Sequence, residues 1–203
     1  MFVGTEAADT IASAQSGWFF GAGGNDTITI ESGSNTIHGG NGDDVITLGA
    51  GNDKVFAGAG NDTIHAGLGA NEVYAQAGND IVLAAGGDDK IVGGTGDDVL
   101  AGGEGFDEFV FNINDGRDQI TDFNLDDDTL TFVGFGYESK ENILANMIET
   151  YDGSVLFSDQ GTQIRLSGVS LDEATNKIFF EMRSPVSIEG DLGALSAGGS
   201  TSS

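Results

Sequence analysis

Apolar side chains recur every ninth residue along an uninterrupted stretch of this chain, residues 21–110. The stretch divides into ten nine-residue units, each with an apolar residue at its eighth position: Ile28, Ile37, Ile46, Val55, Ile64, Val73, Val82, Ile91, Leu100 and Phe109. Two outward positions flank each of these residues, which is the period-two pattern of a strand with one buried face. The pattern therefore predicts one short strand in each unit.

The six residues between successive strands are predicted to form turns. The fourth position of every unit is glycine, which adopts positive φ angles at little steric cost. Glycine also leaves its carbonyl oxygen unobstructed, so the turn backbone can offer ligands. A single unit buries only one large side chain, too little to fold alone, and we expect the ten units to stack into one continuous repeat structure.

The sixth position of the unit is acidic. Eight units have aspartate there: Asp26, Asp44, Asp53, Asp62, Asp80, Asp89, Asp98 and Asp107. The other two units have Asn35 and Asn71. Because the chain has no cysteine and only two histidines, carboxylate and carbonyl oxygens are the ligands on offer. Such oxygens suit a hard cation with about six to eight ligands, and calcium is the natural candidate.

Three units show the pattern in its fullest form: GGNGDDVIT at 39–47, GGTGDDVLA at 93–101 and GGEGFDEFV at 102–110. They resemble the RTX nonapeptide family, whose motif is GGxGxDxUx. The resemblance implies an all-β fold, a right-handed parallel β-roll in which two units make one turn and calcium lies between stacked loops. Residues 107–132 resemble the segment that follows the roll in serralysin-type and other type I secreted proteins.

With the family's geometry taken as given, odd and even units lie at opposite edges of the roll. The odd edge has an unbroken acidic row: Asp26, Asp44, Asp62, Asp80 and Asp98. The even edge has Asn35, Asp53, Asn71, Asp89 and Asp107. Because a neutral amide coordinates weakly and does not offset the ion's charge, we expect about four good sites on the odd edge and about one between Asp89 and Asp107. Sites beside the two asparagines should be weak or empty, giving about five to eight calcium ions in all.

Backbone carbonyls complete the expected ligand set. We assign them to Gly21, Gly24, Gly39, Gly40, Asn41, Gly42, Gly58, Gly60, Gly78, Gly87, Gly93, Gly94, Thr95, Gly96, Gly102, Gly103 and Gly105. Asp118 and Asp122, beyond the repeats, are expected to be weak ligands together with Asn35 and Asn71. Asp128 is a further candidate in the same segment, and these late carboxylates could equally be solvated turn residues. The early glycines are missing at 30–31, 75–76 and 84–85, which puts the individual loops at those places in doubt.

The composition suggests four segments. Residues 1–20 form an N-terminal lead-in or cap, 21–110 the β-roll, 111–183 a small β-rich C-terminal cap with one short helix, and 184–203 a flexible tail of small polar residues. The helix is expected at 139–150, where Ser139 is a plausible N-cap. Ser170 and Glu173 have capping-box spacing for a further brief helical turn.

The charge narrows the classes of function. The formal net charge is −26, which argues against nucleic acid and anionic membrane surfaces as partners. Residues 21–110 carry 15 acidic and 2 basic side chains, so we expect this segment to be unfolded without calcium and to fold with it.

No segment is long and apolar enough for membrane insertion, and no N-terminal signal peptide is visible. The resemblance implies a secreted or cell-surface protein that leaves through type I secretion machinery.

Two interpretations of function stay open. We favour a calcium-folded secretion and folding module, since no GxSxG, HExxH or cysteine nucleophile is present; any catalytic domain would lie outside this chain. The alternative is an adhesive module that binds polysaccharide or a cell surface through an outward row on the even units: His38, Phe56, Tyr74 and Val92. That row could equally be covered by Trp18, Phe19 and Phe20, and we favour such internal cover.

Overall fold

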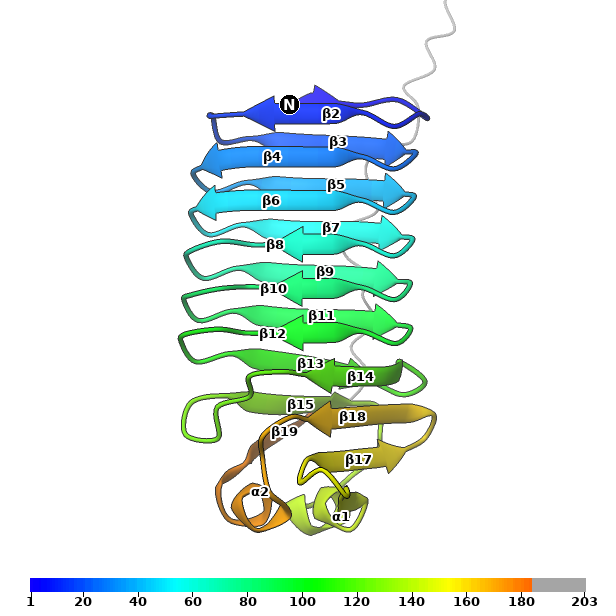
Figure 1. The fold of residues 1–203 in the computed structure, drawn as a ribbon, viewed down its shortest axis with the longest axis vertical. Helices are drawn as coiled ribbons and strands as arrows, with labels where there is room; N and C mark the ends of the chain where they lie inside the picture. The colour runs from blue at the N-terminus through cyan, green and yellow to red at the C-terminus, as the bar shows by residue number, and fades with distance from the viewer. Residues whose placement is uncertain (184–203) are drawn as a thin grey trace, which may run out of the picture.

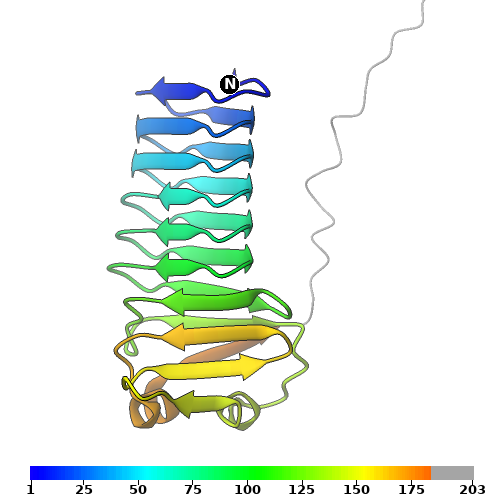
Figure 2. The same cartoon turned by 45° about the vertical axis from the view of Figure 1, so that its right-hand side comes forward.

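A computed structural model describes residues 1–183 of the chain, and the tail expected at 184–203 lies outside the described residues. The described part is an elongated column of stacked coils with two sheets facing each other and a small cap at its lower end (Figures 1 and 2). The all-β parallel β-roll predicted from the repeats is thereby confirmed. None of the helices in residues 1–183 is long and apolar enough to span a membrane.

One face of the column is a nine-stranded sheet in which neighbouring strands run parallel. In spatial order its strands are β1 (Phe2–Val3), β3 (Trp18–Gly23), β5 (Thr36–Asn41), β7 (Lys54–Ala59), β9 (Glu72–Ala77), β11 (Lys90–Thr95), β13 (Glu108–Asn112), β15 (Thr129–Val133) and β19 (Phe179–Arg183). The eighth-position residues of the even units lie in β5, β7, β9, β11 and β13.

The opposite face is a ten-stranded sheet, parallel from β2 to β18. Its strands are β2 (Thr10–Ser13), β4 (Thr27–Ser32), β6 (Val45–Ala50), β8 (Thr63–His65), β10 (Ile81–Leu83), β12 (Val99–Ala101), β14 (Gly116–Ile120), β18 (Thr162–Leu166), β17 (Val155–Asp159) and β16 (Met147–Glu149). The last three strands pair antiparallel and finish the sheet at the cap.

The cap contains two short helices, the expected one and a second where the sequence suggested a brief helical turn. The first, α1 (Lys140–Leu144), begins after Ser139 but stops well before Thr150, so the predicted helix is wrong over its second half. There Met147 pairs with Phe157 in an antiparallel ladder, and the strand ladder replaces the helix. The second, α2 (Leu171–Lys177), starts at the predicted capping box, where the Ser170 side chain accepts the Glu173 N–H.

The core is one apolar column between the two sheets. Every eighth-position residue of the ten units has 0% of its surface exposed, and residues 18 apart stand side by side, such as Ile37 beside Val55 and Ile46 beside Ile64. Burying a side chain of this size is worth about 1.5–3 kcal/mol. Each coil therefore adds only two or three such contributions, and the coils depend on their neighbours and on their turns.

The fourth-position glycine is required by the turn geometry. Gly60 has a φ of +135°, and a Cβ placed on it would lie 2.3 Å from the carbonyl oxygen of Gly42 in the coil above. Both the backbone angle and the close approach exclude a larger residue. Where an earlier glycine is missing, the backbone keeps a positive φ without it, as at Gln76 (+86°) and Ala85 (+82°).

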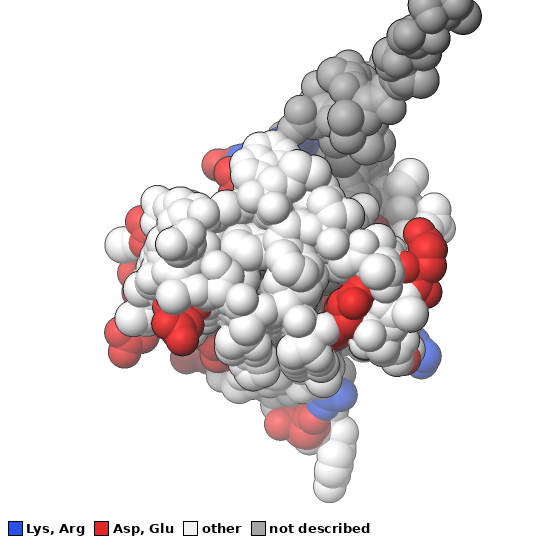
Figure 3. Space-filling model, turned by 90° about the horizontal axis from the view of Figure 1, so that it is seen from above, with Lys and Arg blue, Asp and Glu red and all other residues white. Residues whose placement is uncertain are grey.

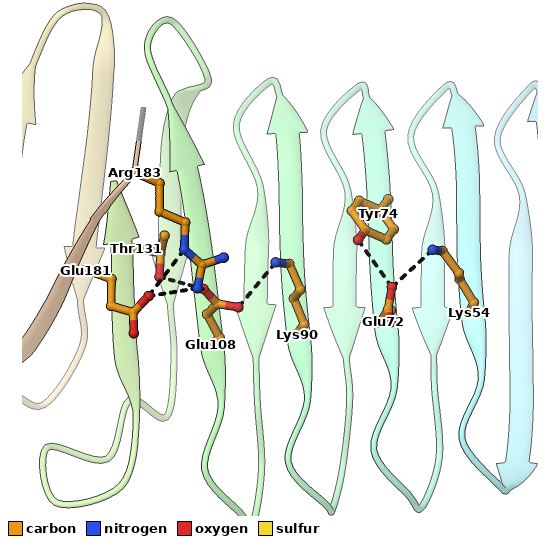
Figure 4. Close-up of polar contacts among 8 residues, drawn as sticks. All are labelled: Lys54, Glu72, Tyr74, Lys90, Glu108, Thr131, Glu181 and Arg183. Atoms are coloured by element: carbon orange, nitrogen blue, oxygen red, sulfur yellow. Dashed lines mark hydrogen bonds and ion pairs between the residues drawn. The ribbon is translucent and has the colours of Figure 1, made fainter. Parts of the chain in front are cut away.

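The outer face of the nine-stranded sheet carries a line of paired charges. Lys54 bonds Glu72 at 3.1 Å and Lys90 bonds Glu108 at 3.2 Å, and all four residues occupy the seventh position of their units. Figure 4 shows the line continuing to Arg183 of β19, which lies 2.9 Å from Glu108. These exposed pairs contribute at most about 1 kcal/mol each, so this face is mainly a solvated surface.

A row of stacked rings runs along the same face. Phe20, His38, Phe56 and Tyr74 form this aromatic row, with centroids 4.8, 4.9 and 5.1 Å apart and interplanar angles of 4°, 15° and 12°. The expected internal cover by residues 18–20 is wrong. Trp18 is 58% exposed and Phe19 is buried in the core, while Phe20 extends the row instead of covering it, because strand alternation points neighbouring residues to opposite faces.

Candidate metal centres along the two edges

The turns at the two edges of the column each bring one sixth-position residue per coil into a vertical row. The odd edge, where the nine-stranded sheet leads into the ten-stranded one, has the row Asp26, Asp44, Asp62, Asp80 and Asp98. The even edge, where the chain crosses back, has Asn35, Asp53, Asn71, Asp89 and Asp107. Seen along the column axis, acidic side chains gather at the flanks while the middle of the N-terminal end is uncharged (Figure 3).

Each row is tied together by one repeated hydrogen bond. The Oδ1 atom of each residue accepts the backbone N–H of the row member in the coil before it. On the odd edge the distances are 2.8 Å from Asp26 to Asp44 and from Asp44 to Asp62, and 2.7 Å from Asp62 to Asp80. The even edge repeats the bond, for example from Asn71 to Asp89 at 2.7 Å. This bond fixes the orientation of every carboxylate and leaves Oδ2 pointing into the turn.

The Oδ2 atoms of eight aspartates are buried and accept no hydrogen bond from residues 1–183: Asp26, Asp44, Asp53, Asp62, Asp80, Asp89, Asp98 and Asp107. A buried carboxylate oxygen without a donor is costly, since it loses its hydration without compensation. The eight are the aspartates that the repeat pattern singles out as calcium ligands. A cation is the partner that their chemistry calls for.

Carbonyl oxygens converge on these Oδ2 atoms. A Cβ on Gly21 would stand 2.2 Å from Asp26 Oδ2 and 2.4 Å from the carbonyl oxygen of Gly39 in the next coil. A Cβ on Gly39 would meet Asp44 Oδ2 and the carbonyl oxygen of Ala57, each at 2.4 Å. Two acceptors with no donor between them form a cradle that fits a hard cation. In residues 1–183 no three His, Cys, Asp or Glu side chains form a metal-binding cluster, so a cation at this place would need backbone carbonyls as further ligands.

Burial makes these carboxylates reluctant to carry charge in the metal-free protein. It raises the pKa of Asp44, Asp80, Asp98 and Asp107 to about 6. Burial raises the pKa of Asp62 and Asp89 to about 7, with a smaller upward contribution from the like charges of neighbouring row members, Asp80 and Asp107. The pKa of Asp53 is also raised by burial, although bonds from the Asn35 backbone and side chain lower it.

The two asparagines occupy the sixth position of their units, as the aspartates do elsewhere, but all their side-chain polar atoms are hydrogen-bonded. Oδ1 of Asn35 accepts the Gly17 N–H at 2.9 Å, and Oδ1 of Asn71 accepts the Asp53 N–H at 3.0 Å. Their Nδ2 atoms donate within the turn, to the carbonyl oxygens of Gly33 and Gly69. Neither asparagine has an unpartnered buried side-chain atom, in contrast to the eight aspartates.

Some of the expected carbonyl ligands already accept hydrogen bonds. The carbonyl oxygen of Thr95 accepts the Gly78 N–H at 2.9 Å, and that of Gly96 accepts the Arg117 N–H at 3.1 Å. A carbonyl oxygen has two lone pairs, so both can still contact a cation. The fourth-position glycines stack closely, and a Cβ on Gly42 would lie 2.4 Å from the Gly24 carbonyl oxygen.

Both rows extend beyond the repeats. Asp118 Oδ1 accepts the Asp98 N–H, and Asp128 Oδ1 accepts the Asp107 N–H, each at 3.1 Å; Asp9 is the odd-edge member above Asp26. Burial raises the pKa of Asp118 to about 8. Asp122 is in neither row, because its carboxylate accepts the N–H groups of Gly102 and Gly103 at 3.1 and 3.0 Å.

The sequence analysis gave Asp9 no place in the ligand set. The signal that could have found it is its spacing of 17 residues to Asp26, close to the regular 18. Asp9 differs from the repeat aspartates, because its Oδ2 accepts both the N–H and the hydroxyl of Thr5 at 2.6 and 2.9 Å.

The comparison with protein-family models agrees with the repeat pattern. A family model described as RTX calcium-binding nonapeptide repeat (4 copies) matches residues 20–55, 29–64, 49–82, 56–91 and 74–109. A comparison with curated proteins gives no match. Among solved structures, the chain is similar to the extracellular lipase LipA from Serratia marcescens, at 21% identity and a TM-score of 0.42, over 88% of this chain and 39% of the lipase. It is also similar to the AlgE6R3 subunit of the mannuronan C5-epimerase from Azotobacter vinelandii, at 21% identity and a TM-score of 0.30, over 98% of this chain and 92% of that subunit.

Proposed function

Residues 20–109 are RTX calcium-binding nonapeptide repeats, and from this premise we propose that the chain is a module that is unfolded without calcium and folds on binding it. The observation that carries the proposal is the set of eight buried Oδ2 atoms without a donor. We further propose that this module belongs to a secreted protein that meets its calcium outside the cell.

The electrostatics of the rows support calcium-dependent folding. Coils of a β-roll stack at about the strand spacing of 4.8 Å, so ionised carboxylates of one row face like charges in the coils above and below. At that distance two unit charges repel by roughly 3 kcal/mol at an effective dielectric constant near 20. Each coil buries only two or three large apolar side chains, and the repulsion offsets much of what that burial contributes.

A calcium ion supplies two positive charges and accepts about six to eight oxygen ligands at 2.3–2.6 Å. In this proposal the eight aspartates direct Oδ2 toward the ion, and glycine carbonyls of the same turn and the next coil complete the shell. The ligands of each ion thus come from two neighbouring coils, so calcium binding and the stacking of those coils are coupled. The free energy of binding is then free energy of folding.

Limited proteolysis with increasing calcium tests this function. We expect residues 1–183 to be digested throughout in calcium-free buffer and to become resistant at about 0.1–1 mM calcium, the range of extracellular modules. Magnesium is the control, because it requires tight octahedral geometry and dehydrates reluctantly. Equal resistance with and without calcium, or equal protection by magnesium, would contradict the proposal.

Export through type I secretion machinery is the second part of the proposal. It is supported by the RTX repeats and by the resemblance of residues 107–132 to segments of type I secreted proteins. Any catalytic activity of the whole protein would then lie outside this chain. Comparing the amount of protein in the medium of cells with and without a type I transporter tests the proposal, and equal amounts would contradict it.

The adhesive alternative is less well supported by the geometry of the aromatic row. Sugar rings stack on aromatic faces, but the faces of His38 and Phe56 are covered by their neighbours at 4.8–5.1 Å, which leaves ring edges outward. We therefore expect the double variant Phe56→Ser, Tyr74→Ser to bind polysaccharide arrays no differently from the parent chain. A loss of glycan binding with unchanged calcium-induced folding would instead favour the adhesive function.

A further inference from the structure

The two asparagines of the even edge differ from the eight aspartates in one atom that decides their chemistry. The backbone N–H groups of Gly17 and Asp53 fix the Oδ1 atoms of Asn35 and Asn71, since only an oxygen can accept them. The Nδ2 atoms therefore occupy the position of the aspartate Oδ2. Each asparagine thus puts a donor where an aspartate has an unpartnered acceptor.

That donor forms hydrogen bonds with oxygen atoms that a cation would otherwise contact. Asn71 Nδ2 donates to the carbonyl oxygen of Gly69 at 3.0 Å. Asn35 Nδ2 donates to the carbonyl oxygen of Gly33 and, at 2.9 Å, to Oδ1 of Asp53 in the next coil. Both asparagines are buried, at 5% and 1% exposure. These bonds satisfy both turns from within, and the Asn35 bond to Asp53 also links its turn to the next coil without any ion.

The asparagines also separate the charges of the even edge. Asp53 stands between Asn35 above and Asn71 below, so it faces no carboxylate within its own row. Asp62, on the odd edge, stands between Asp44 and Asp80. The part of the even edge above Asp89 therefore has less like-charge repulsion to overcome than the odd edge has.

We propose that Asn35 and Asn71 act in place of a bound cation, their amide Nδ2 atoms serving as the positive partner of the turn oxygens. The inference rests on the proposed calcium-dependent folding and deepens it. The turns at 30–37 and 66–73 close without calcium, and the ligand sites lie where aspartate stands. A single change from asparagine to aspartate then converts a metal-independent turn into a calcium site.

The test is to count bound calcium by equilibrium dialysis for the parent chain and the variant Asn71→Asp, whose turn retains Gly67 and Gly69. We expect one additional bound ion and a higher calcium midpoint for folding, because the new Oδ2 faces the Gly69 carbonyl without a donor. The matched control is Asn52→Asp, on the same edge. Asn52 is exposed, and its Oδ1 accepts the Ala70 N–H at 3.1 Å. An aspartate at this position would keep that bond, so the Asn52→Asp variant adds the same negative charge without creating a new site.

A second variant covers the case in which Asn71→Asp does not fold. In Asn71→Ala the donor is lost, so hydrogen exchange at 66–73 should become faster at saturating calcium while the number of bound ions stays that of the parent chain. Fewer bound ions in Asn71→Ala would make Asn71 a ligand and overturn the inference. So would an unchanged ion count in a folded Asn71→Asp, or an equal gain in Asn52→Asp. A parent chain that neither binds calcium nor folds on it would instead defeat the proposed function.

Discussion

At the scale of single residues, the identity of the sixth position determines what each turn needs. An aspartate such as Asp62 uses Oδ1 for the stacking bond and leaves Oδ2 without a donor. An asparagine such as Asn71 makes the same stacking bond and donates its amide to Gly69. The stacking hydrogen bond is therefore common to both, and the demand for a cation belongs to the aspartates.

Removing one aspartate should damage two neighbouring sites. The Asp62 side chain accepts the Asp44 N–H, and the Asp62 backbone N–H donates to the Asp80 side chain. Asp62 is therefore bonded to the odd-edge coils on both sides of it. We expect Asp62→Ala to raise the calcium midpoint for folding by roughly tenfold, equivalent to about 1.4 kcal/mol. Asn71→Ala is the comparison and should shift the midpoint less. Equal midpoints in a calcium titration followed by tryptophan fluorescence would argue against the assigned edges.

The fourth-position glycine gives a separate prediction about backbone geometry. Gly60→Ala places a Cβ 2.3 Å from the Gly42 carbonyl oxygen at a φ of +135°, and we expect it to cost roughly 2 kcal/mol or more. The reverse change, Gln76→Gly, relieves a φ of +86° and should leave stability unchanged or raised. Thermal melts of both variants in saturating calcium measure the difference. A Gly60→Ala melt like that of the parent chain would contradict the turn geometry.

Regular spacing explains which site residues could be found from the sequence. The eight aspartates repeat at a constant interval, so the pattern alone selects them. Asp118 and Asp128 join the rows at intervals of 20 and 21 residues, because the connections lengthen after the last unit. The sequence marks them as candidates, but the pairing of β14 and β15 with the strands before them is what assigns each to a row. The Nδ2 bonds of the asparagines likewise depend on side-chain orientation, which the sequence does not contain.

At the scale of elements, the repeat pattern predicts the strands well and the cap less well. One strand per unit is confirmed, but β4 and β6 span six residues, because turn residues continue the ladder with the coil beside them. The expected helix at 139–150 is interrupted by β16. Local propensity gives way there to a pairing with residues 155–157, which no local pattern reveals. The four-segment division of the chain stays a proposal.

At the scale of the two edges, the stability of the folded column should depend on pH in opposite directions with and without calcium. In the metal-free protein, burial raises the pKa of Asp62 and Asp89 to about 7 from an ordinary value of 3.8. A raised folded-state pKa contributes stability that is present below the ordinary value and lost as pH rises through about 7. Metal-free protein should therefore be more ordered at about pH 5 than at about pH 8.

With saturating calcium the trend should reverse, because protonated carboxylates are poor ligands and acid competes with the metal. Far-UV circular dichroism in chelator at the two pH values measures the first trend, and thermal melts in saturating calcium measure the second. A sheet signal that rises with pH in chelator would show that the buried carboxylates do not resist ionisation. A melt that is independent of pH in calcium would show that they are not ligands.

At the scale of the whole molecule, the column is built from coils that are individually too weak to stand. Its core is narrow, since each coil contributes one central side chain from each sheet and few others, and like charges are concentrated along its edges. The upper end presents only short strands, β1 and β2, while the lower end is closed by α1, α2 and the antiparallel strands β16 to β18 (Figure 1). The cap can support the nearest coils, but the middle of the column depends on its turns.

The central claim is that the edge aspartates need a cation for the column to form. Far-UV circular dichroism of the intact chain, recorded in chelator and again after calcium is restored, tests it most directly. We predict a spectrum without sheet signal in chelator and full recovery of the sheet signal at about 1 mM calcium. A chelated protein that keeps its complete sheet signal and melts at the same temperature would contradict the account.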